Sequence, residues 1–179
     1  MARKVILFIA QTLDGYIAEA DGKIDFLIDN DFTSGETMDH EYDKLTKRID
    51  TVVMGRRTYD QVVNELSPNN YPYDDFENYV LTTRPSEDLD NIHFIDNDVV
   101  KLVKDLKEKA SKKDIWIIGG SSIIAPLVNS DLIDIYQIGV IPIVLGNGIS
   151  LFSHKVDFKE LNLDSVKKIN GIAYLTYNK

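Results

Sequence analysis

The feature that most constrains this fold is a recurring pattern of short apolar runs, most of which lead through a polar turn into a segment with helical periodicity. The runs are rich in β-branched residues, which is typical of strands buried on both faces of a parallel sheet. They lie at residues 5–10, 51–54, 79–82 and 115–118. Helices are expected at residues 36–48, from 55 to about 66, from 98 onward and from 121 onward. This alternation predicts a mostly parallel sheet with helices on both faces.

The last quarter of the chain has a different pattern. After Asp131, residues 135–141, about 158–169 and 172–177 are predicted as longer strands, and no helix separates them convincingly. We expect these strands to pair in antiparallel fashion at the edge of the sheet. No repeat, low-complexity tract or linker interrupts the sequence, so residues 1–179 are expected to form one domain. The predicted fold class is three-layer α/β, with a mostly parallel central sheet and antiparallel C-terminal edge strands.

Composition limits the ligands that such a fold could hold. The chain carries 29 acidic residues against 20 basic ones, a formal net charge of −9 and no cysteine. Nucleic-acid binding depends on neutralising phosphates, so this charge argues against a nucleic-acid partner. The absence of cysteine excludes disulfides and thiol nucleophiles, and the three widely separated histidines predict no metal site. An anionic ligand would therefore have to be held by locally placed positive groups.

No apolar stretch approaches the roughly 20 residues that a membrane-spanning helix requires. The basic start followed by apolar residues 5–10 shares features with a signal peptide, but the polar residues from Gln11 to Asp14 end the run too soon. We therefore expect a cytoplasmic protein without a membrane partner.

Candidate binding residues follow three of the predicted strands. In parallel sheets, ligands bind beyond the carboxyl ends of the strands. A helix N-terminus with glycine, hydroxyl and arginine residues is suited to phosphate there. One such turn is weak evidence, but three suggest a ligand with several phosphates, such as a dinucleotide, and the arginines favour NADP over NAD. The three turns are Gly55-Arg56-Arg57-Thr58, Thr82-Thr83-Arg84 and Gly119-Gly120-Ser121-Ser122.

The motifs that the chain lacks are consistent with the same chemistry. There is no Gly-x-Ser-x-Gly elbow, no P-loop pattern and no Gly-x-Gly-x-x-Gly after a strand. Hydride transfer needs none of them, because the cofactor carries the reaction and the protein supplies position and desolvation.

These segments resemble those of a known family. The chain is similar over essentially its whole length to the dihydrofolate reductase-like fold, and more closely to the RibD C-terminal domain family of riboflavin-biosynthesis reductases. The order and spacing of five segments carry the resemblance. They are Thr12-Leu13-Asp14-Gly15-Tyr16-Ile17-Ala18, Val53-Met54-Gly55-Arg56-Arg57-Thr58-Tyr59, Val80-Leu81-Thr82-Thr83-Arg84, Ile117-Ile118-Gly119-Gly120, and the stretch from Asp134 through Pro142-Ile143-Val144-Leu145-Gly146-Asn147-Gly148 to Leu151-Phe152.

The resemblance implies NADPH as the cofactor, a small heterocyclic substrate and a homodimer. It implies that the backbone at Ala10 and Ile17 faces the nicotinamide, and that the Gly119–Gly120 pair cradles the pyrophosphate, commonly through a cis peptide bond. The turn at Gly55 would hold the phosphates, and the turn at Thr82 would lie along the 2′-phosphate. The predicted cofactor-binding residues are Ala10, Ile17, Gly55, Arg56, Arg57, Thr58, Thr82, Thr83, Arg84, Ile118, Gly119, Gly120, Ser121 and Ser122.

One catalytic candidate comes from the same resemblance. Dihydrofolate reductases bind the pterin ring through a helix carboxylate, and counting back without gaps from Gly55 places Asp39 there. A partly buried carboxylate could have a raised pKa and supply a proton. The alternative is that Asp39 only stabilises the acidic first turn of its helix.

Two aromatic segments also have alternative interpretations. Trp116 is expected in the core rather than against a ligand, because it lies inside an apolar strand. The aromatic stretch at residues 71–76 could border a substrate pocket, although pinning of a loop is the favoured interpretation.

Two hypotheses for function remain open. The first is an NADPH-dependent reductase of a small heterocycle, such as a pterin or 5-amino-6-(5-phosphoribosylamino)uracil. The second is a non-catalytic NADP(H)-binding dimer that kept the fold and lost turnover. The second hypothesis is supported by the altered substrate-binding motif, in which Ile124 stands where dihydrofolate reductases usually have an aromatic residue.

Overall fold

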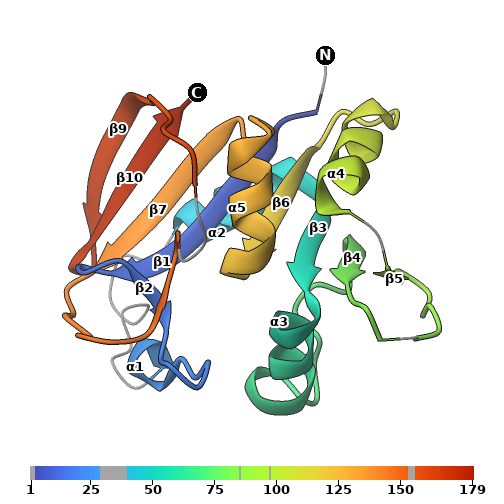
Figure 1. The fold of residues 1–179 in the computed structure, drawn as a ribbon, viewed down its shortest axis with the longest axis horizontal. Coiled ribbons are helices and arrows are strands. Elements are labelled where there is room, and N and C mark those ends of the chain that lie inside the picture. The colour runs from blue at the N-terminus through green and yellow to red at the C-terminus, as the bar shows by residue number, and fades with distance from the viewer. Residues whose placement is uncertain (1–2, 29–39, 85, 97, 153–155) are drawn as a thin grey trace.

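The structure is a computed structural model that describes residues 3–28, 40–84, 86–96, 98–152 and 156–179. Its centre is an eight-stranded sheet (Figure 1). The first six strands in the spatial order are parallel, and the last two join in antiparallel pairs. The order is β5 (Ile92–Ile95), β4 (Glu77–Leu81), β3 (Ile49–Gly55), β6 (Asp114–Gly119), β1 (Val5–Thr12), β7 (Ile135–Ile141), β10 (Ile172–Asn178) and β9 (Asn162–Ile169).

Helices cover both faces of this sheet, which confirms the three-layer α/β prediction. On one face lie α2 (His40–Arg48), α3 (Arg56–Gln61) and the π-helical turn η1 (Val62–Leu66), and on the other lie α4 (Val99–Glu108) and α5 (Ser121–Asn129). Alternate residues of each strand enter different clusters, so that Ile117 packs with α4 and α5 while Trp116 packs with α2 and α3. Both faces of the central strands are therefore buried, as their continuous apolar runs require.

Local signals fix several element boundaries. Asp98 caps α4, because its carboxylate accepts a hydrogen bond of 2.8 Å from the backbone N–H of Val100. Gly55 and Gly120 are the N-cap residues of α3 and α5, so each of these helices begins directly after a strand. The helix N-termini after β3 and β6 therefore lie at the carboxyl edge of the sheet.

Some boundaries differ from the prediction. The strand expected from about residue 158 begins at Asn162, and Phe158 before it is 90% exposed. The helix expected to reach about residue 66 changes to π-helical geometry at Val62. A small second sheet of β2 (Tyr16–Ala18) and β8 (Ile149–Ser150) was not predicted, because two such short strands carry no periodicity of their own.

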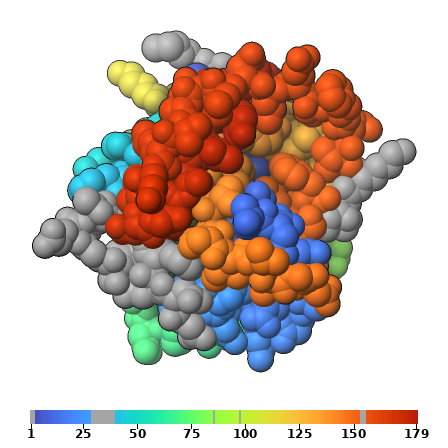
Figure 2. Space-filling view, turned by 90° about the vertical axis from the view of Figure 1, so that its left-hand side faces the viewer, coloured from blue at the N-terminus to red at the C-terminus, as the bar shows by residue number. Residues whose placement is uncertain are grey.

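Strand β9 forms one edge of the sheet. Within the described residues it pairs with β10 alone, and its Leu163 and Val166 side chains are 57% and 60% exposed. Figure 2 looks onto this end of the molecule, where the red segment that contains β9 and β10 forms much of the upper surface. Separately, no helix in the described part of the chain is both long enough and apolar enough to cross a membrane.

Candidate functional site

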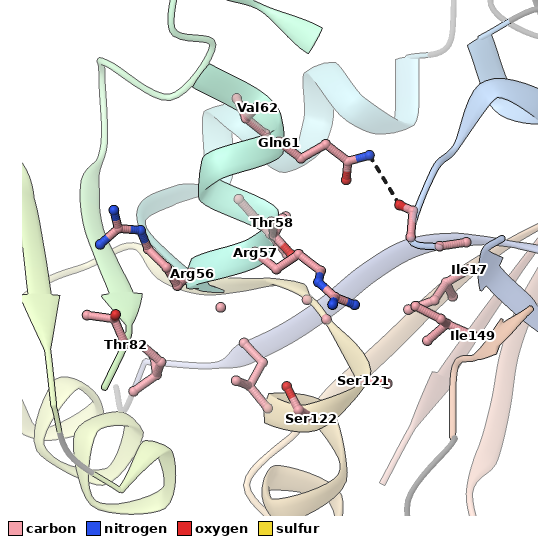
Figure 3. Close-up of a pocket in the computed structure, with 18 of the residues that line it drawn as sticks. Ile17, Arg56, Arg57, Thr58, Gln61, Val62, Thr82, Ser121, Ser122 and Ile149 are labelled. Atoms are coloured by element: carbon pink, nitrogen blue, oxygen red, sulfur yellow. Dashed lines mark hydrogen bonds between the residues drawn. The ribbon is translucent and has the colours of Figure 1, made fainter. Parts of the chain in front are cut away.

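A cavity of about 760 Å³ opens at the carboxyl ends of β1, β3, β4 and β6. Every residue predicted to bind a cofactor lines it. Figure 3 shows Ile17 on one side of this space and Thr82 on the other, with α3 above it and the start of α5 below. The three strand-end turns, which are far apart in sequence, therefore meet at a single site.

The turn after β3 places two arginines in different directions. Figure 3 shows Arg56 directed toward the β4 side of the cavity, and Arg57 directed the opposite way, toward Ile17 and Ile149. The Arg56 guanidinium lies 5.1 Å from the ring centroid of Phe94 and donates a hydrogen bond of 2.6 Å to the Ser86 hydroxyl. These contacts fix its position at the β4 side of the cavity.

Asp60 connects Arg56 to Arg84. One carboxylate oxygen of Asp60 accepts from Nε of Arg56 and the other accepts from Arg84, each at 2.6 Å. Burial raises the pKa of Asp60, but hydrogen bonds from the two arginines outweigh this effect and hold the pKa below its ordinary value. The carboxylate thus stays charged and holds two guanidinium groups side by side. Sequence reasoning missed Asp60, although its spacing of four residues from Arg56 on a helix was a usable signal.

Arg57 is exposed and forms no ion pair within the described residues. Its side chain runs past Gly22, where an added Cβ would meet two Arg57 atoms at 3.8 Å. One turn later, the Gln61 side-chain amide donates to the Gly22 carbonyl oxygen at 3.2 Å, which is the dashed line in Figure 3. Arg57 is therefore a cation at the cavity that is available to an anionic ligand.

The turn after β6 provides a close backbone approach. The Gly119–Gly120 peptide bond is cis, as the resemblance implied, and Gly119 has φ of +131°, which residues with a side chain rarely adopt. A Cβ added at Gly120 would lie 3.9 Å from Oγ1 of Thr58, in the space between the α3 and α5 turns. Glycine leaves this space open, and the N-termini of both helices border it.

The cavity extends to both faces of the sheet edge. On the α4–α5 side its walls include Ile9, Ile95 and Ile123. On the opposite side, the apolar walls belong to two hydrophobic clusters, one packed against α2 and α3 and the other containing residues of α1 (Asp25–Ile28). Leu66 is in neither cluster, but it lies in η1 with Val62 and lines the same part of the cavity. We call this second part the apolar lobe, and it comprises Ala10, Leu27, Val62, Leu66, Tyr73 and Ile118.

The small sheet of β2 and β8 closes the end of the cavity near Ala10. Asp14 anchors it, because its carboxylate accepts from the backbone N–H of Gly146 at 2.7 Å and from that of Leu145 at 3.1 Å. The hydrogen bond from the Thr12 hydroxyl, together with these two, lowers the pKa of Asp14 to about 2. A charged Asp14 thus ties the β1–β2 turn to the segment before β8, which positions Ile17 and Ile149.

Comparison with known proteins agrees with this geometry. A family model of the RibD C-terminal domain matches residues 3–172. This chain belongs to the RibD C-terminal domain family.

Relatives of this family member span nearly its whole length. The chain is 38% identical to the uncharacterised protein YwjB of Bacillus subtilis, over 99% of this chain and 98% of that one. A structure from Shewanella sp. PV-4, named for riboflavin biosynthesis, has 31% identity and a TM-score of 0.81, covering 99% and 98% of the two chains. Dihydrofolate reductase from Enterococcus faecalis, solved with NADP(H), has 19% identity and a TM-score of 0.63 over 99% and 98%. The dihydrofolate reductase-like fold of the RibD C-terminal domain is thereby confirmed.

Other sequence-based predictions have different outcomes. Asp39 lies outside the described residues, so its role stays a prediction. Trp116 is 4% exposed in the core, as expected, and its indole N–H donates to the Phe8 carbonyl oxygen at 3.0 Å.

The favoured interpretation of residues 71–76, that they pin a loop, was incomplete, because Tyr73 lines the cavity. Asp96 also lines it and was missed, although its position directly after β5 was a signal.

Proposed function

We propose that this protein is an NADPH-dependent oxidoreductase that reduces a small heterocyclic metabolite. One observation carries the proposal: three strand-end turns with glycine, hydroxyl or arginine residues line one cavity in a chain whose net charge is −9. Such a concentration of anion-binding groups in an acidic protein favours a ligand with several phosphates.

The groups that line the cavity suggest where each part of NADPH would lie. Arg56 and Arg84 would hold the 2′-phosphate, because two guanidinium groups lie side by side there. The cis Gly119–Gly120 turn and the helix N-termini beside it would hold the pyrophosphate. Ala10 and Ile17 would face the nicotinamide, and the apolar walls around them would exclude water. Bound NADPH would supply the hydride, while the chain binds and orients the reactants.

The substrate would occupy the apolar lobe. Candidate substrates are pterins and 5-amino-6-(5-phosphoribosylamino)uracil, which the family resemblance suggests. Asp39 remains the proposed residue for orienting such a ring. Its test is Asp39→Asn, which should lower turnover and leave NADPH binding unchanged.

Cofactor binding is tested by thermal unfolding of the purified protein with NADPH or NADH. We expect NADPH to raise the melting temperature much more than NADH, because only NADPH carries the 2′-phosphate. Arg56→Ala should remove most of this difference. Lys101→Ala is the matched control, since Lys101 also pairs with an aspartate four residues away, at 2.6 Å, but does not line the cavity. Equal and negligible shifts with both cofactors would contradict the proposal.

Turnover is a separate question. Loss of NADPH absorbance with a panel of pterins, flavin precursors and carbonyl compounds would support the reductase. Tight NADPH binding without oxidation across the panel would instead favour the non-catalytic binding protein.

We further propose a homodimer formed through the β9 edge. An exposed edge strand with apolar side chains tends to pair with another chain. In an antiparallel pair centred on Val166, Asp164 of each copy would face Lys168 of the other. The strand is therefore complementary to itself in charge.

A further inference from the structure

The apolar lobe contains one polar side chain, Tyr73, among the described residues that define it. The other members are Ala10, Leu27, Val62, Leu66 and Ile118, whose side chains are apolar. Gln61 lies nearby, but its side-chain amide is engaged with the Gly22 carbonyl oxygen. Among the described residues that define the lobe, the Tyr73 hydroxyl is therefore the single polar side-chain group.

Core packing fixes the position of the Tyr73 ring. Its edge-to-face neighbours are Tyr71 and Trp116, with centroids 5.5 Å away in each case and interplanar angles of 89° and 86°. Trp116 is itself held by the hydrogen bond to Phe8. The Tyr73 ring therefore has a defined orientation before any ligand binds.

The two neighbouring tyrosines use their hydroxyls differently. Tyr71 donates to the side-chain oxygen of Asn78 at 2.8 Å, whereas the Tyr73 hydroxyl has no hydrogen bond within the described chain. No fully buried side-chain oxygen or nitrogen among the described residues lacks a partner, so the unpartnered Tyr73 hydroxyl is not fully buried. A tyrosine whose only role is to pin a loop would be expected to use its hydroxyl within the protein, as Tyr71 does.

Burial raises the pKa of Tyr73 to about 12. The hydroxyl therefore keeps its proton at neutral pH and can donate a hydrogen bond.

We propose that Tyr73 is a substrate-binding residue that selects planar, uncharged rings bearing a hydrogen-bond acceptor. The walls of the lobe hold the faces of the ring, and the Tyr73 hydroxyl donates to a ring nitrogen or carbonyl oxygen. This inference rests on the proposed function, because the ring would be the molecule that receives the hydride near Ala10.

Quinoline and naphthalene are suitable probes, because they have the same bicyclic shape and differ by one acceptor nitrogen. Their dissociation constants are measured by ligand-observed NMR for the wild type, Tyr73→Phe and Tyr71→Phe, with and without NADPH. Tyr73→Phe should weaken quinoline binding about three- to tenfold, as expected for one net hydrogen bond. Naphthalene binding should stay unchanged, and Tyr71→Phe should alter neither constant selectively.

Four outcomes would overturn the inference. Three of them are an equal effect of Tyr73→Phe on both rings, no effect on either ring, and no binding of either ring to the wild type. The fourth is the same loss of ring selectivity in Tyr71→Phe, because a packing change would then explain the result. Failure of NADPH to bind would count against the proposed function, whereas the ring preference of the cofactor-free protein tests Tyr73 separately.

Discussion

Arg84 and Asp60 form an ion pair of 2.6 Å although they belong to different strand-end connections. Arg84 follows β4, and Asp60 lies in the helix that follows β3. The pair places the Arg84 guanidinium beside that of Arg56, because Asp60 also accepts from Arg56. A cation from one connection is thereby held in position by an anion from the other.

Arg84→Ala should weaken NADPH binding about tenfold and leave NADH binding unchanged. A hydrogen bond to a charged group contributes about 1.5–3 kcal/mol, and the lower end applies because the Arg84 side chain is 62% exposed. Isothermal titration with both cofactors measures the effect. Lys101→Ala should have no such selectivity, and a parallel loss of NADH affinity would show that Arg84 does not recognise the 2′-phosphate.

Gly148→Ala should destabilise the protein by about 1–3 kcal/mol. A Cβ at this position would overlap the backbone carbonyl oxygen of Ala18 in β2, and backbone cannot move aside as a side-chain end can. Urea unfolding measures the change. Gly55→Ala is the control for stability, since the nearest atoms to its added Cβ lie at 3.9 Å. Equal stabilities of the two variants would contradict this account of β2 and β8.

The stability contributed by His93 should decrease as the pH rises. Its ring contacts Glu77 at 3.0 Å and Asp88 at 3.2 Å. Burial lowers the pKa of His93, but these two carboxylates outweigh burial and raise the pKa above its ordinary value. The stabilisation by His93 is therefore complete below its pKa in the unfolded chain, which is about 6.5. It is lost as the pH rises through the higher pKa of His93 in the folded protein.

The free energy of unfolding of the wild type and of His93→Gln measures this effect across about pH 5.5 to 8.5. The wild-type advantage should shrink toward the alkaline end. An advantage that grows with pH would mean that the neutral ring is the stabilising form.

Val166→Lys should convert a dimer into monomers. It would place two positive charges opposite each other at the centre of the proposed β9 pair. Light scattering coupled to size exclusion measures the mass. Leu89→Lys is the control, because Leu89 is 55% exposed beside β5, at the opposite end of the sheet. A monomeric wild type would refute the proposed interface directly.

The phosphate-binding turns were predictable because they depend on local sequence. Gly55 and Gly120 each stand between an apolar strand and a helix, and this order alone places them at the carboxyl edge of a parallel sheet. The sequence also indicated which of these turns carry arginine. Residues identified in this way all line the cavity.

Residues that approach the cavity from distant elements could not be predicted in this way. Ile149 lines the cavity only because β8 pairs with β2, and nothing in a two-residue strand identifies its partner. Tyr73 lies in a loop whose path depends on ring contacts with Trp116, which belongs to another strand. Long-range packing of this kind is set by the whole fold rather than by a local pattern.

The position of β1 in the sheet has a consequence for synthesis of the chain. Although β1 is made first, both of its neighbours, β6 and β7, come from beyond residue 113. Strand β1 therefore has no neighbouring strand while most of the chain emerges from the ribosome. Its exposed apolar side chains make the nascent chain prone to aggregation during that time. The pairing of β1 with β7, which supports Ala10, can form only when residues up to Ile141 are present, so this wall of the cavity is completed late in synthesis.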